Sequence, residues 1–353
     1  MVRNKTLIYK RYTPLEPVPG ENLAVEDRPF DLDAAPPPGG ITAKNTFLSL
    51  DPYQRGQMRR AEDPGTYSVP WIEGRPAVVT ALSTVLQSGH PTLRAGDQIL
   101  GFADAAEYAA IPAELLAAGT RAVPPSEVPP GVAPEALPGA LGIPGLAAYV
   151  SFFEYVPALR AGRTMLVSAA SGAVGQIVGQ LGKMHGMKVI GSTGSPDKVE
   201  FVTRELGFDG AWDYKTETTG AALARLAPEG LDVYYENVGG EMLETALRHM
   251  KDFGTIIASG MVSEYNVPDQ DKYGVKTLMN IVLKRLSVHG FICGDPHHVQ
   301  KYGPTFARDI LTWISEGKIK TRNEVVEGLD SAPDAFNRMI RGDKFGKMVI
   351  KVD

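Results

Sequence analysis

One stretch, residues 164–175 with the sequence TMLVSAASGAVG, constrains the fold of this 353-residue chain more than any other. Its first part, Thr164–Ser168, is a short apolar run of strand length, and the apolar side chains of Gln176–Met184 recur on one side of a helix. A strand, a turn of small residues and a helix are the context that a dinucleotide-binding turn requires. The stretch therefore predicts that the N-terminus of this helix binds a pyrophosphate.

The turn departs from the G-x-G-x-x-G pattern, because Ala170 stands where the first glycine is expected. Gly172 lets the backbone approach a pyrophosphate, and Gly175 lets the helix lie close to the strand. Tight turns of this kind also occur without a ligand, so the hexapeptide alone leaves a nucleotide site and a purely structural turn both open.

Composition and charge exclude several classes of protein. Charged residues make up 22% of the chain and the net charge is −5, so nothing indicates nucleic acid or an anionic membrane as a partner. No apolar run reaches transmembrane length, and the first residues lack the apolar centre of a signal peptide. The single cysteine, Cys293, excludes an intrachain disulfide and a cysteine-rich zinc site. We therefore expect a cytoplasmic protein of about two domains.

Residues 1–138 have the texture of an all-β barrel or sandwich, with short strands between proline- and glycine-rich turns. The expected strands are Lys5–Lys10, Ile41–Leu50, Arg75–Leu86, Asp97–Ala103 and Ala106–Ile111. The proline-rich segment Val123–Pro138 indicates a domain boundary or linker.

From about Leu141 strands alternate with helices, which predicts βαβ units and a doubly wound parallel sheet. The expected strands are Thr164–Ser168, Lys188–Ser192, Leu231–Glu236, Gly254–Ala258 and Leu286–Ile292. The expected helices are Leu141–Tyr155, Gly172–Met184, Asp197–Leu206, Gly220–Leu226, Glu241–Met250 and Tyr302–Gly317. Two last strands, Val325–Gly328 and Lys347–Val352, are expected to return to the first domain. The predicted domains are therefore 1–138 with 318–353, and 139–317.

The end of the strand Lys188–Ser192 predicts the choice of cofactor. An NAD site places Asp or Glu there, whereas Gly191–Ser195 reads GSTGS and Lys198 follows within a turn. Hydroxyl groups and a cation suit a 2′-phosphate that a carboxylate would repel, so we expect NADPH in preference to NADH. A solvated charge on a helix face is the open alternative for Lys198.

Two further segments follow strands of the predicted sheet, where open α/β sheets bind ligands. They are Asn237–Gly240 and Ser259–Ser263. Asn237 can line a cofactor crevice, and the same turn can also simply begin the next helix; these two interpretations are compatible.

The chain offers little for a metal or a cysteine nucleophile. Cys293, His297 and His298 form its one tight Cys/His group, and one thiol with two adjacent imidazoles makes a poor tetrahedral site. Gly294–Pro296 is typical of a turn and not of a Cys–His catalytic pair. We therefore expect no metal and attribute the chemistry to the hydride of the cofactor.

Several motifs together resemble the zinc-independent medium-chain reductases, which include prostaglandin and leukotriene reductases and NADPH-dependent alkenal double-bond reductases. The resemblance spans nearly the whole chain and is carried by Leu48–Met58, Ile143–Tyr155, Ser168–Gly175, Gly191–Val199, Asp213–Thr216, Glu236–Glu241, Ser259–Asn266 and Gly342–Val352. It implies a GroES-like β-barrel catalytic domain beside a Rossmann domain, reduction of an α,β-unsaturated ketone or aldehyde, and a homodimer joined through the edge of the Rossmann sheet.

The resemblance also implies roles for individual residues. Contacts with NADPH fall on Gly172, Ala173, Val174 and Gly175 (pyrophosphate), Lys198 and Tyr214 (2′-phosphate), Asn237 (nicotinamide half), Ser259, Gly260, Met261, Val262, Ser263 and Tyr265 (around the cofactor), and Phe291, Ile292 and Cys293 (along the nicotinamide). Tyr265 is implied as proton donor or enolate stabiliser, and Tyr53 as a residue that faces the substrate. Packing is the open alternative for both tyrosines, and water is an alternative proton source.

Two positions depart from the family pattern. Leu283 stands in a segment where members often have tyrosine, and Lys344 stands where relatives have an asparagine that contacts the cofactor. Three other functions stay open at this point: a quinone reductase, a non-catalytic cofactor-binding protein, and a pathway-specific reductase of a secondary metabolite.

Overall fold

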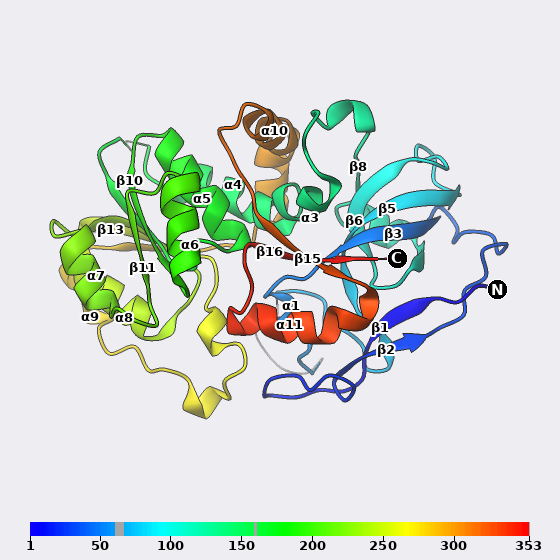
Figure 1. Ribbon diagram of the computed structural model, residues 1–353, viewed down its shortest axis with the longest axis horizontal. Helices are drawn as coiled ribbons and strands as arrows, with labels where there is room; N and C mark the ends of the chain where they lie inside the picture. The colour runs from blue at the N-terminus through cyan, green and yellow to red at the C-terminus, as the bar shows by residue number, and fades with distance from the viewer. Residues whose placement is uncertain (61–66, 159–160, 353) are drawn as a thin grey trace. The chain divides into compact units, whose positions relative to one another are not determined.

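The computed structural model describes residues 1–60, 67–158 and 161–352. The chain divides into two compact units, Met1–Ile143 with Asn323–Asp353 and Pro144–Arg322. Figure 1 traces the chain through both of them. Each unit is described by itself below, and the domain limits at 138 and 318 stay predictions.

The first unit is built mainly of strands, several of them long and strongly curved in Figure 1. Its strands are β1 (Lys5–Tyr9), β2 (Leu23–Asp27), β3 (Ile41–Ser49), β4 (Arg75–Pro76), β5 (Val78–Ser88), β6 (Gln98–Asp104), β7 (Tyr108–Ile111), β8 (Arg121–Ala122), β15 (Asn323–Glu327) and β16 (Lys347–Lys351). Its α-helices are α1 (Gln54–Gln57), α2 (Ala113–Ala117), α3 (Leu137–Ala140) and α11 (Ala332–Arg341). The larger sheet has the order β15-β16-β3-β5-β6-β8 with β7 also on β3, and the smaller one has the order β2-β1-β4.

The C-terminal strands complete the larger sheet of this unit. β16 pairs antiparallel with β3, so that Val349 lies opposite Ser49 and Lys351 opposite Phe47. β15 pairs parallel with β16 on the other side. Buried side chains from β3, β5 and β16 fill the interior, which confirms the GroES-like barrel expected from the sequence.

The second unit is an α/β fold around one six-stranded sheet. Its strands are β9 (Thr164–Val167), β10 (Lys188–Thr193), β11 (Gly210–Asp213), β12 (Leu231–Glu236), β13 (Met250–Ala258) and β14 (Ser287–Gly290). Its α-helices are α4 (Ile143–Tyr155), α5 (Ala173–Met184), α6 (Pro196–Glu200), α7 (Thr219–Leu226), α8 (Gly240–His249), α9 (Met279–Leu283) and α10 (Pro296–Ser315). The strand order β11-β10-β9-β12-β13-β14, with every pair parallel, is the Rossmann order.

Helices cover both faces of this sheet. Leu166 and Ile190 pack in one core cluster with residues of α7 and α8. Met165 and Val189, which alternate with them along β9 and β10, face Gly182 of α5. Because β9 is covered on both faces, all four of its residues are buried and Met165–Val167 are apolar; the doubly wound sheet is confirmed.

The structure also differs from the sequence-based prediction in places. The expected helix Asp197–Leu206 consists of α6 followed by a π-helix, Phe201–Glu205. The short strands β2, β8 and β11 and the helices α1, α2, α3, α9 and α11 were not expected. The helix expected to begin at Tyr302 begins at Pro296.

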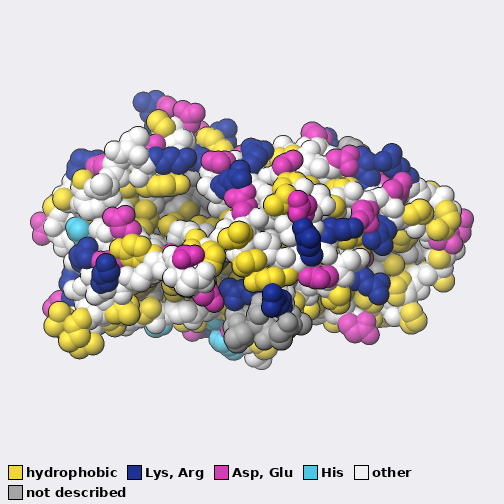
Figure 2. Space-filling model, turned by 90° about the horizontal axis from the view of Figure 1, so that it is seen from below, with side chains coloured by type: hydrophobic (Ala, Val, Ile, Leu, Met, Phe, Trp, Pro, Cys, Tyr) yellow, Lys and Arg dark blue, Asp and Glu magenta, His cyan; other side chains and the backbone are white. Residues whose placement is uncertain are grey.

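Figure 2 shows basic and acidic side chains interspersed over the face that it displays. Within the described ranges, no single helix has both the length and the apolar character needed to cross a membrane. Only the bent pair Pro134–Ala140 and Ile143–Tyr155 reaches them, and only when the two are taken together.

Candidate functional site

The site is built where the chain reverses its direction of strand addition, between β9 and β12 at the centre of the Rossmann sheet. Open α/β sheets bind ligands at the carboxyl ends of the strands at this switch point. Ser168 follows β9 and Asn237 follows β12, and two hydrogen bonds join them. The backbone N–H of Asn237 donates to Ser168 Oγ (2.8 Å), and its side-chain amide donates to the Ser168 carbonyl oxygen (2.7 Å). The structure therefore brings two of the sequence-predicted segments together.

The glycine-containing turn has the shape that a phosphate requires. Gly172 is the N-cap of α5, so the N–H groups of Ala173 and Val174 lie in the first turn, where the helix itself supplies no acceptor. A Cβ on Gly175 would lie 2.5 Å from the carbonyl oxygen of Ala169, so only glycine lets α5 approach β9 this closely. These features fit a pyrophosphate at the helix N-terminus.

The end of β10 gathers the residues predicted to select the 2′-phosphate. Ser195 caps α6 and accepts a hydrogen bond from the backbone N–H of Lys198. The backbone N–H of Tyr214 donates to the carbonyl oxygen of Thr193 (3.0 Å). A Cβ on Gly194 would lie 3.1 Å from the Tyr214 hydroxyl oxygen. The hydroxyl of Tyr214 and the helix of Lys198 thus lie at the end of β10, where Gly191–Ser195 include no carboxylate; the neighbouring strand, β11, places Asp213 opposite Thr193.

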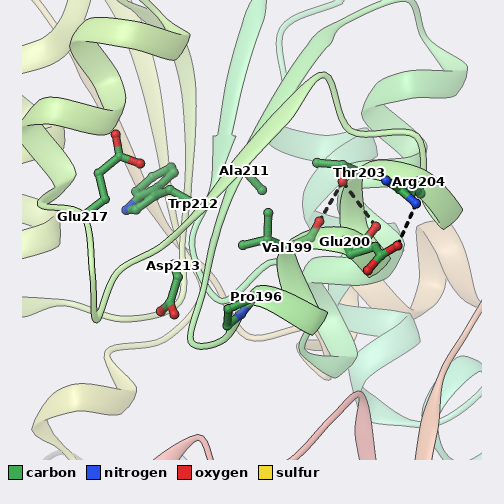
Figure 3. A pocket seen from close by; sticks show the side chains of 9 residues that line it. All are labelled: Pro196, Val199, Glu200, Thr203, Arg204, Ala211, Trp212, Asp213 and Glu217. Carbon is green, nitrogen blue, oxygen red and sulfur yellow. Dashed lines mark hydrogen bonds and ion pairs between the residues drawn. The ribbon is translucent and has the colours of Figure 1, made fainter.

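A groove of about 450 Å³ lies between β11 and the helical segment that begins with α6. It is lined by Pro196, Val199, Glu200, Thr203, Arg204, Ala211, Trp212, Asp213 and Glu217. Figure 3 shows Val199 directed toward Ala211 and the Arg204 guanidinium paired with Glu200. Three carboxylates against one already paired guanidinium make this groove a poor phosphate site. The groove therefore does not compete with the cluster around Lys198.

The segment Ser259–Ser263 folds over the turn that begins at Asn237. The N–H of Val262 donates to the Asn237 carbonyl oxygen (3.1 Å), and Ser263 Oγ donates to the Val238 carbonyl oxygen (2.6 Å). Tyr265 directs its hydroxyl back into this segment, where it accepts a hydrogen bond from the N–H of Met261 (3.4 Å). The two segments expected to wrap the cofactor therefore form one continuous wall.

Glu236 was not predicted from the sequence as a site residue. Its hydrogen bonds hold the turn after β12 and the segment that begins at Ser259. Its carboxylate is fully buried and accepts hydrogen bonds from Ser168 Oγ (3.1 Å), Tyr234 Oη (2.6 Å) and the backbone N–H groups of Val238 and Gly239. Burial raises the pKa of the Glu236 carboxyl, and these hydrogen bonds oppose the rise. The sequence offered one signal for this role, an acidic residue directly before Asn237. Acidic residues at strand ends are usually exposed to solvent, so this signal did not predict a buried carboxylate.

The segment Phe291–Cys293 is held by a buried histidine. His298 Nδ1 donates to the carbonyl oxygen of Ile292 (2.7 Å), and Nε2 forms a hydrogen bond with the hydroxyl of Tyr155 (2.9 Å). His298 is 1% exposed. A histidine with both ring nitrogens engaged thereby fixes the backbone that is expected to run along the nicotinamide.

The same histidine belongs to the group closest to a metal site among the described residues. Ligand atoms of Asp295, His297 and His298 lie within 4.8 Å of one another. Because both ring nitrogens of His298 already bond Ile292 and Tyr155, a metal could bind it only by breaking one of these bonds. Cys293 is buried and is not a member of this group.

The remaining predicted residues lie elsewhere. Tyr53 and Lys344 belong to the first unit, where Tyr53 precedes α1 and Lys344 Nζ donates to the Gly346 carbonyl oxygen (2.6 Å). Two residues before Tyr53, Asp51 forms a buried ion pair with Lys347 (3.3 Å). The remaining departure from the family pattern, Leu283, lies exposed on α9 in the second unit.

A Rossmann sheet with a pyrophosphate-type turn, joined in one chain to a β-barrel that the C-terminal strands complete, defines a nucleotide-dependent oxidoreductase. Family models match both parts. Residues 21–118 match the N-terminal domain of oxidoreductase, and residues 173–308 match the zinc-binding dehydrogenase model.

Individual proteins are similar over the full length. The chain is 42% identical over 352 residues to the NADP-dependent oxidoreductase RED1 of Cochliobolus heterostrophus, covering 100% of this chain and 98% of that protein. It is 37% identical over 353 residues to the 2-alkenal reductase (NADP(+)-dependent) of Nicotiana tabacum, covering 99% and 98%. The crystal structure of CurA from Vibrio vulnificus in complex with NADPH has a TM-score of 0.85 at 29% identity and covers 99% of both chains. The chain belongs to the zinc-independent medium-chain reductase family and is an oxidoreductase.

Proposed function

We propose that this chain reduces the carbon–carbon double bond of α,β-unsaturated ketones or aldehydes with NADPH. The observation that carries the proposal is the cluster of Ser195, Lys198 and Tyr214 at the end of β10, because hydroxyl groups and a cation suit a 2′-phosphate and Gly191–Ser195 place no carboxylate there. The names of the relatives, an NADP-dependent oxidoreductase and a 2-alkenal reductase, support both the cofactor and the substrate class. NADPH is the cofactor, and it supplies the hydride when it is bound.

The residues around the switch point would hold this cofactor. The helix N-terminus at Gly172–Gly175 suits the pyrophosphate, and the wall formed by Asn237 with Ser259–Ser263 suits the nicotinamide half. Phe291–Cys293, fixed through His298, would lie along the nicotinamide, and Lys344 would take the place of the asparagine found in relatives.

The tyrosines Tyr265 and Tyr53 are the proposed hydrogen-bond donors to the substrate. Reduction at the β-carbon places negative charge on the carbonyl oxygen, so preorganised donors around that oxygen lower the barrier. A phenol hydroxyl is neutral near pH 7 and can donate a hydrogen bond or a proton to an enolate. The bond from Met261 N–H to Tyr265 Oη fixes that hydroxyl at the wall of the crevice. Water is the alternative source of the α-proton.

The proposal is tested by incubating the purified full-length chain with NADPH and an enone, an enal or benzoquinone. We expect NADPH oxidation with the enone and enal, and a saturated carbonyl product by mass spectrometry. Turnover of benzoquinone alone would instead identify a quinone reductase. A chain that binds NADPH but oxidises it with none of these substrates would contradict the proposal.

We also propose limits for the two domains and an oligomeric state. Residues 139–317 are proposed as the cofactor domain, and residues 1–138 with 318–353 as the catalytic domain. A cytoplasmic homodimer is proposed through β14, because this strand ends the sheet, its Val288 is exposed, and α9, which precedes it in the chain, also exposes apolar side chains. Light scattering tests it: Val288→Lys should convert a dimer to a monomer, and a wild-type monomer would refute it.

A further inference from the structure

Glu236 is a buried acid whose charge has no cationic partner. The side chain is 0% exposed, and among the residues that the structure describes no lysine, arginine or histidine forms an ion pair with it. Its four partners are neutral donors: two hydroxyls and two backbone N–H groups. A buried carboxylate without a counter-ion is costly, so its place in the fold calls for an explanation.

The partners favour the ionised form. The N–H groups of Val238 and Gly239 can only donate, and both point at the same carboxylate oxygen, Oε1. Gly239 is also the N-cap of the ten-residue helix α8, so the positive end of the helix dipole lies beside the charge. Tyr234 Oη supplies a donor to Oε2. These contacts stabilise an anion only in part, because burial still raises the pKa of the Glu236 carboxyl.

The position of this charge links it to the cofactor. Glu236 lies at the switch point, directly before Asn237, and its backbone carbonyl oxygen accepts hydrogen bonds from the N–H groups of Ser259 (2.9 Å) and Gly260 (3.1 Å). Glu236 therefore contacts both segments that are proposed to bind the nicotinamide half, the turn that begins at Asn237 and the segment Ser259–Ser263. NADP⁺ and NADPH share their phosphates and ribose groups and differ at the nicotinamide ring, which is positively charged only when oxidised.

We propose that Glu236 is a buried counter-charge that stabilises the oxidised, cationic nicotinamide relative to the reduced, neutral one. The inference rests on the proposed function, since it requires that the nicotinamide half binds at Asn237. Coulombic attraction across a site shielded from water is stronger than in solvent, so a carboxylate need not touch the ring to change its affinity. Glu236 is thus assigned an electrostatic role beyond capping a helix.

The test is the ratio of the dissociation constants of NADP⁺ and NADPH, measured by calorimetry for the wild type and Glu236→Gln. Glutamine keeps the size and the Oε1 acceptor but removes the charge. We expect the ratio of the NADP⁺ constant to the NADPH constant to rise about threefold or more, mainly through weaker NADP⁺ binding. If the substitution weakens both nucleotides equally, Glu236 only shapes the turn and the inference is overturned.

Two further variants keep the test decisive. Tyr234→Phe removes a donor that stabilises the carboxylate and so favours its protonated form; the ratio should shift in the same direction as with Glu236→Gln, and by no more. Glu236→Asp retains the carboxylate, and it should preserve the ratio even if both constants increase; a ratio altered as much as by glutamine would count against the inference. A wild-type chain that binds neither nucleotide would refute the proposed function instead, so the two failures are distinguishable.

Discussion

Asn237 is bound to Ser168 through both its backbone and its side chain, and the two bonds tie together the strands on either side of the switch point. The backbone bond is available to any residue at this position except proline, whereas the bond to the Ser168 carbonyl oxygen needs a side-chain donor. The amide of Asn237 is therefore what distinguishes this position from others in the turn.

Asn237→Asp should weaken NADPH binding and lower stability. A carboxylate cannot donate to the Ser168 carbonyl oxygen and adds a second negative charge next to Glu236. We expect a loss of about 2 kcal/mol in the free energy of unfolding and an increase of the Michaelis constant for NADPH of about tenfold. Urea denaturation and steady-state kinetics measure the two effects. Asn237→Ala, which adds no charge, should have a smaller effect, and equal effects would argue against the electrostatic part.

Lys198→Ala should raise the Michaelis constant for NADPH about tenfold and leave that for NADH nearly unchanged, because NADH lacks the 2′-phosphate that Lys198 is proposed to bind. Lys188→Ala is the matched control, since Lys188 is an exposed lysine at the opposite end of the same strand, β10. Equal changes for both nucleotides would show that Lys198 is a solvated charge on the face of α6.

Ala169→Gly should stabilise the chain. Ala169 has a φ of +50°, a left-handed conformation that costs a residue with a Cβ about 1 kcal/mol and glycine very little. We expect an increase of about 0.5–1 kcal/mol in the free energy of unfolding. Ala173 lies in the first turn of α5 and has a right-handed helical backbone. Ala173→Gly should therefore lower the free energy of unfolding by a similar amount. Two changes of the same sign would contradict the strain at Ala169.

The Tyr235 hydroxyl should make stability depend on alkaline pH. This side chain is fully buried, and burial raises the pKa of its phenol to about 12 from the ordinary value of 10.0. The native state therefore keeps a proton that the unfolded chain releases, so the contribution is complete below pH 10.0 and is lost as pH rises through about 12.

Tyr235→Phe isolates this contribution from other tyrosines. At neutral pH the variant should be less stable by about 1 kcal/mol, since the buried hydrogen bond between the Tyr235 hydroxyl and Ser151 Oγ (2.8 Å) is lost. As pH rises above 10.0 the difference should shrink and then reverse, because phenylalanine has no proton to lose. Denaturation curves on both sides of this pH provide the measurement, and a constant difference would be the contrary result.

Chelation should leave the enzyme active. The nitrogens of His298 are committed to Ile292 and Tyr155, so removal of divalent metals should change neither turnover nor melting temperature. By contrast, Tyr155→Phe should lower the free energy of unfolding by about 1 kcal/mol through the lost bond to His298. Loss of activity on dialysis against a chelator, restored by zinc, would refute the metal-free chemistry.

The longer strands and helices of the Rossmann unit could be predicted from the sequence, because their apolar residues recur with a period that is visible locally. β12 spans Leu231–Glu236 as expected, and β9 and α5 differ from their predicted bounds by one residue. β11 escaped prediction because Gly210–Asp213 is too short to show a period, and it becomes a strand only by pairing with β10. The π-helix after α6 likewise has no sequence signature in this chain.

The candidate site likewise contains segments that could be predicted from the sequence and residues that could not. Gly172–Gly175 was predicted from its glycine pattern between a strand and a helix, and Ser259–Ser263 from its place at the end of a strand of the parallel sheet. Glu236 and His298 were not assigned these roles, since their importance lies in partners distant in sequence. Glu236 meets Ser168 from another strand, and His298 meets Tyr155 from another helix. Contacts of this kind follow from packing and cannot be inferred from spacing.

The pairing of β16 with β3 has a consequence for biosynthesis. The Rossmann unit, Pro144–Arg322, is continuous in the chain and has all its strands once Arg322 leaves the ribosome. The barrel lacks β16 until residues 347–351 emerge, so the end of β3 that pairs with it, residues 47–49, keeps an open edge while the Rossmann unit can already fold. A nascent chain that stalls after Arg322 and before residues 347–351 would therefore contain a complete Rossmann unit and an incomplete barrel. We expect chaperones to bind such a chain at its unpaired strand edge.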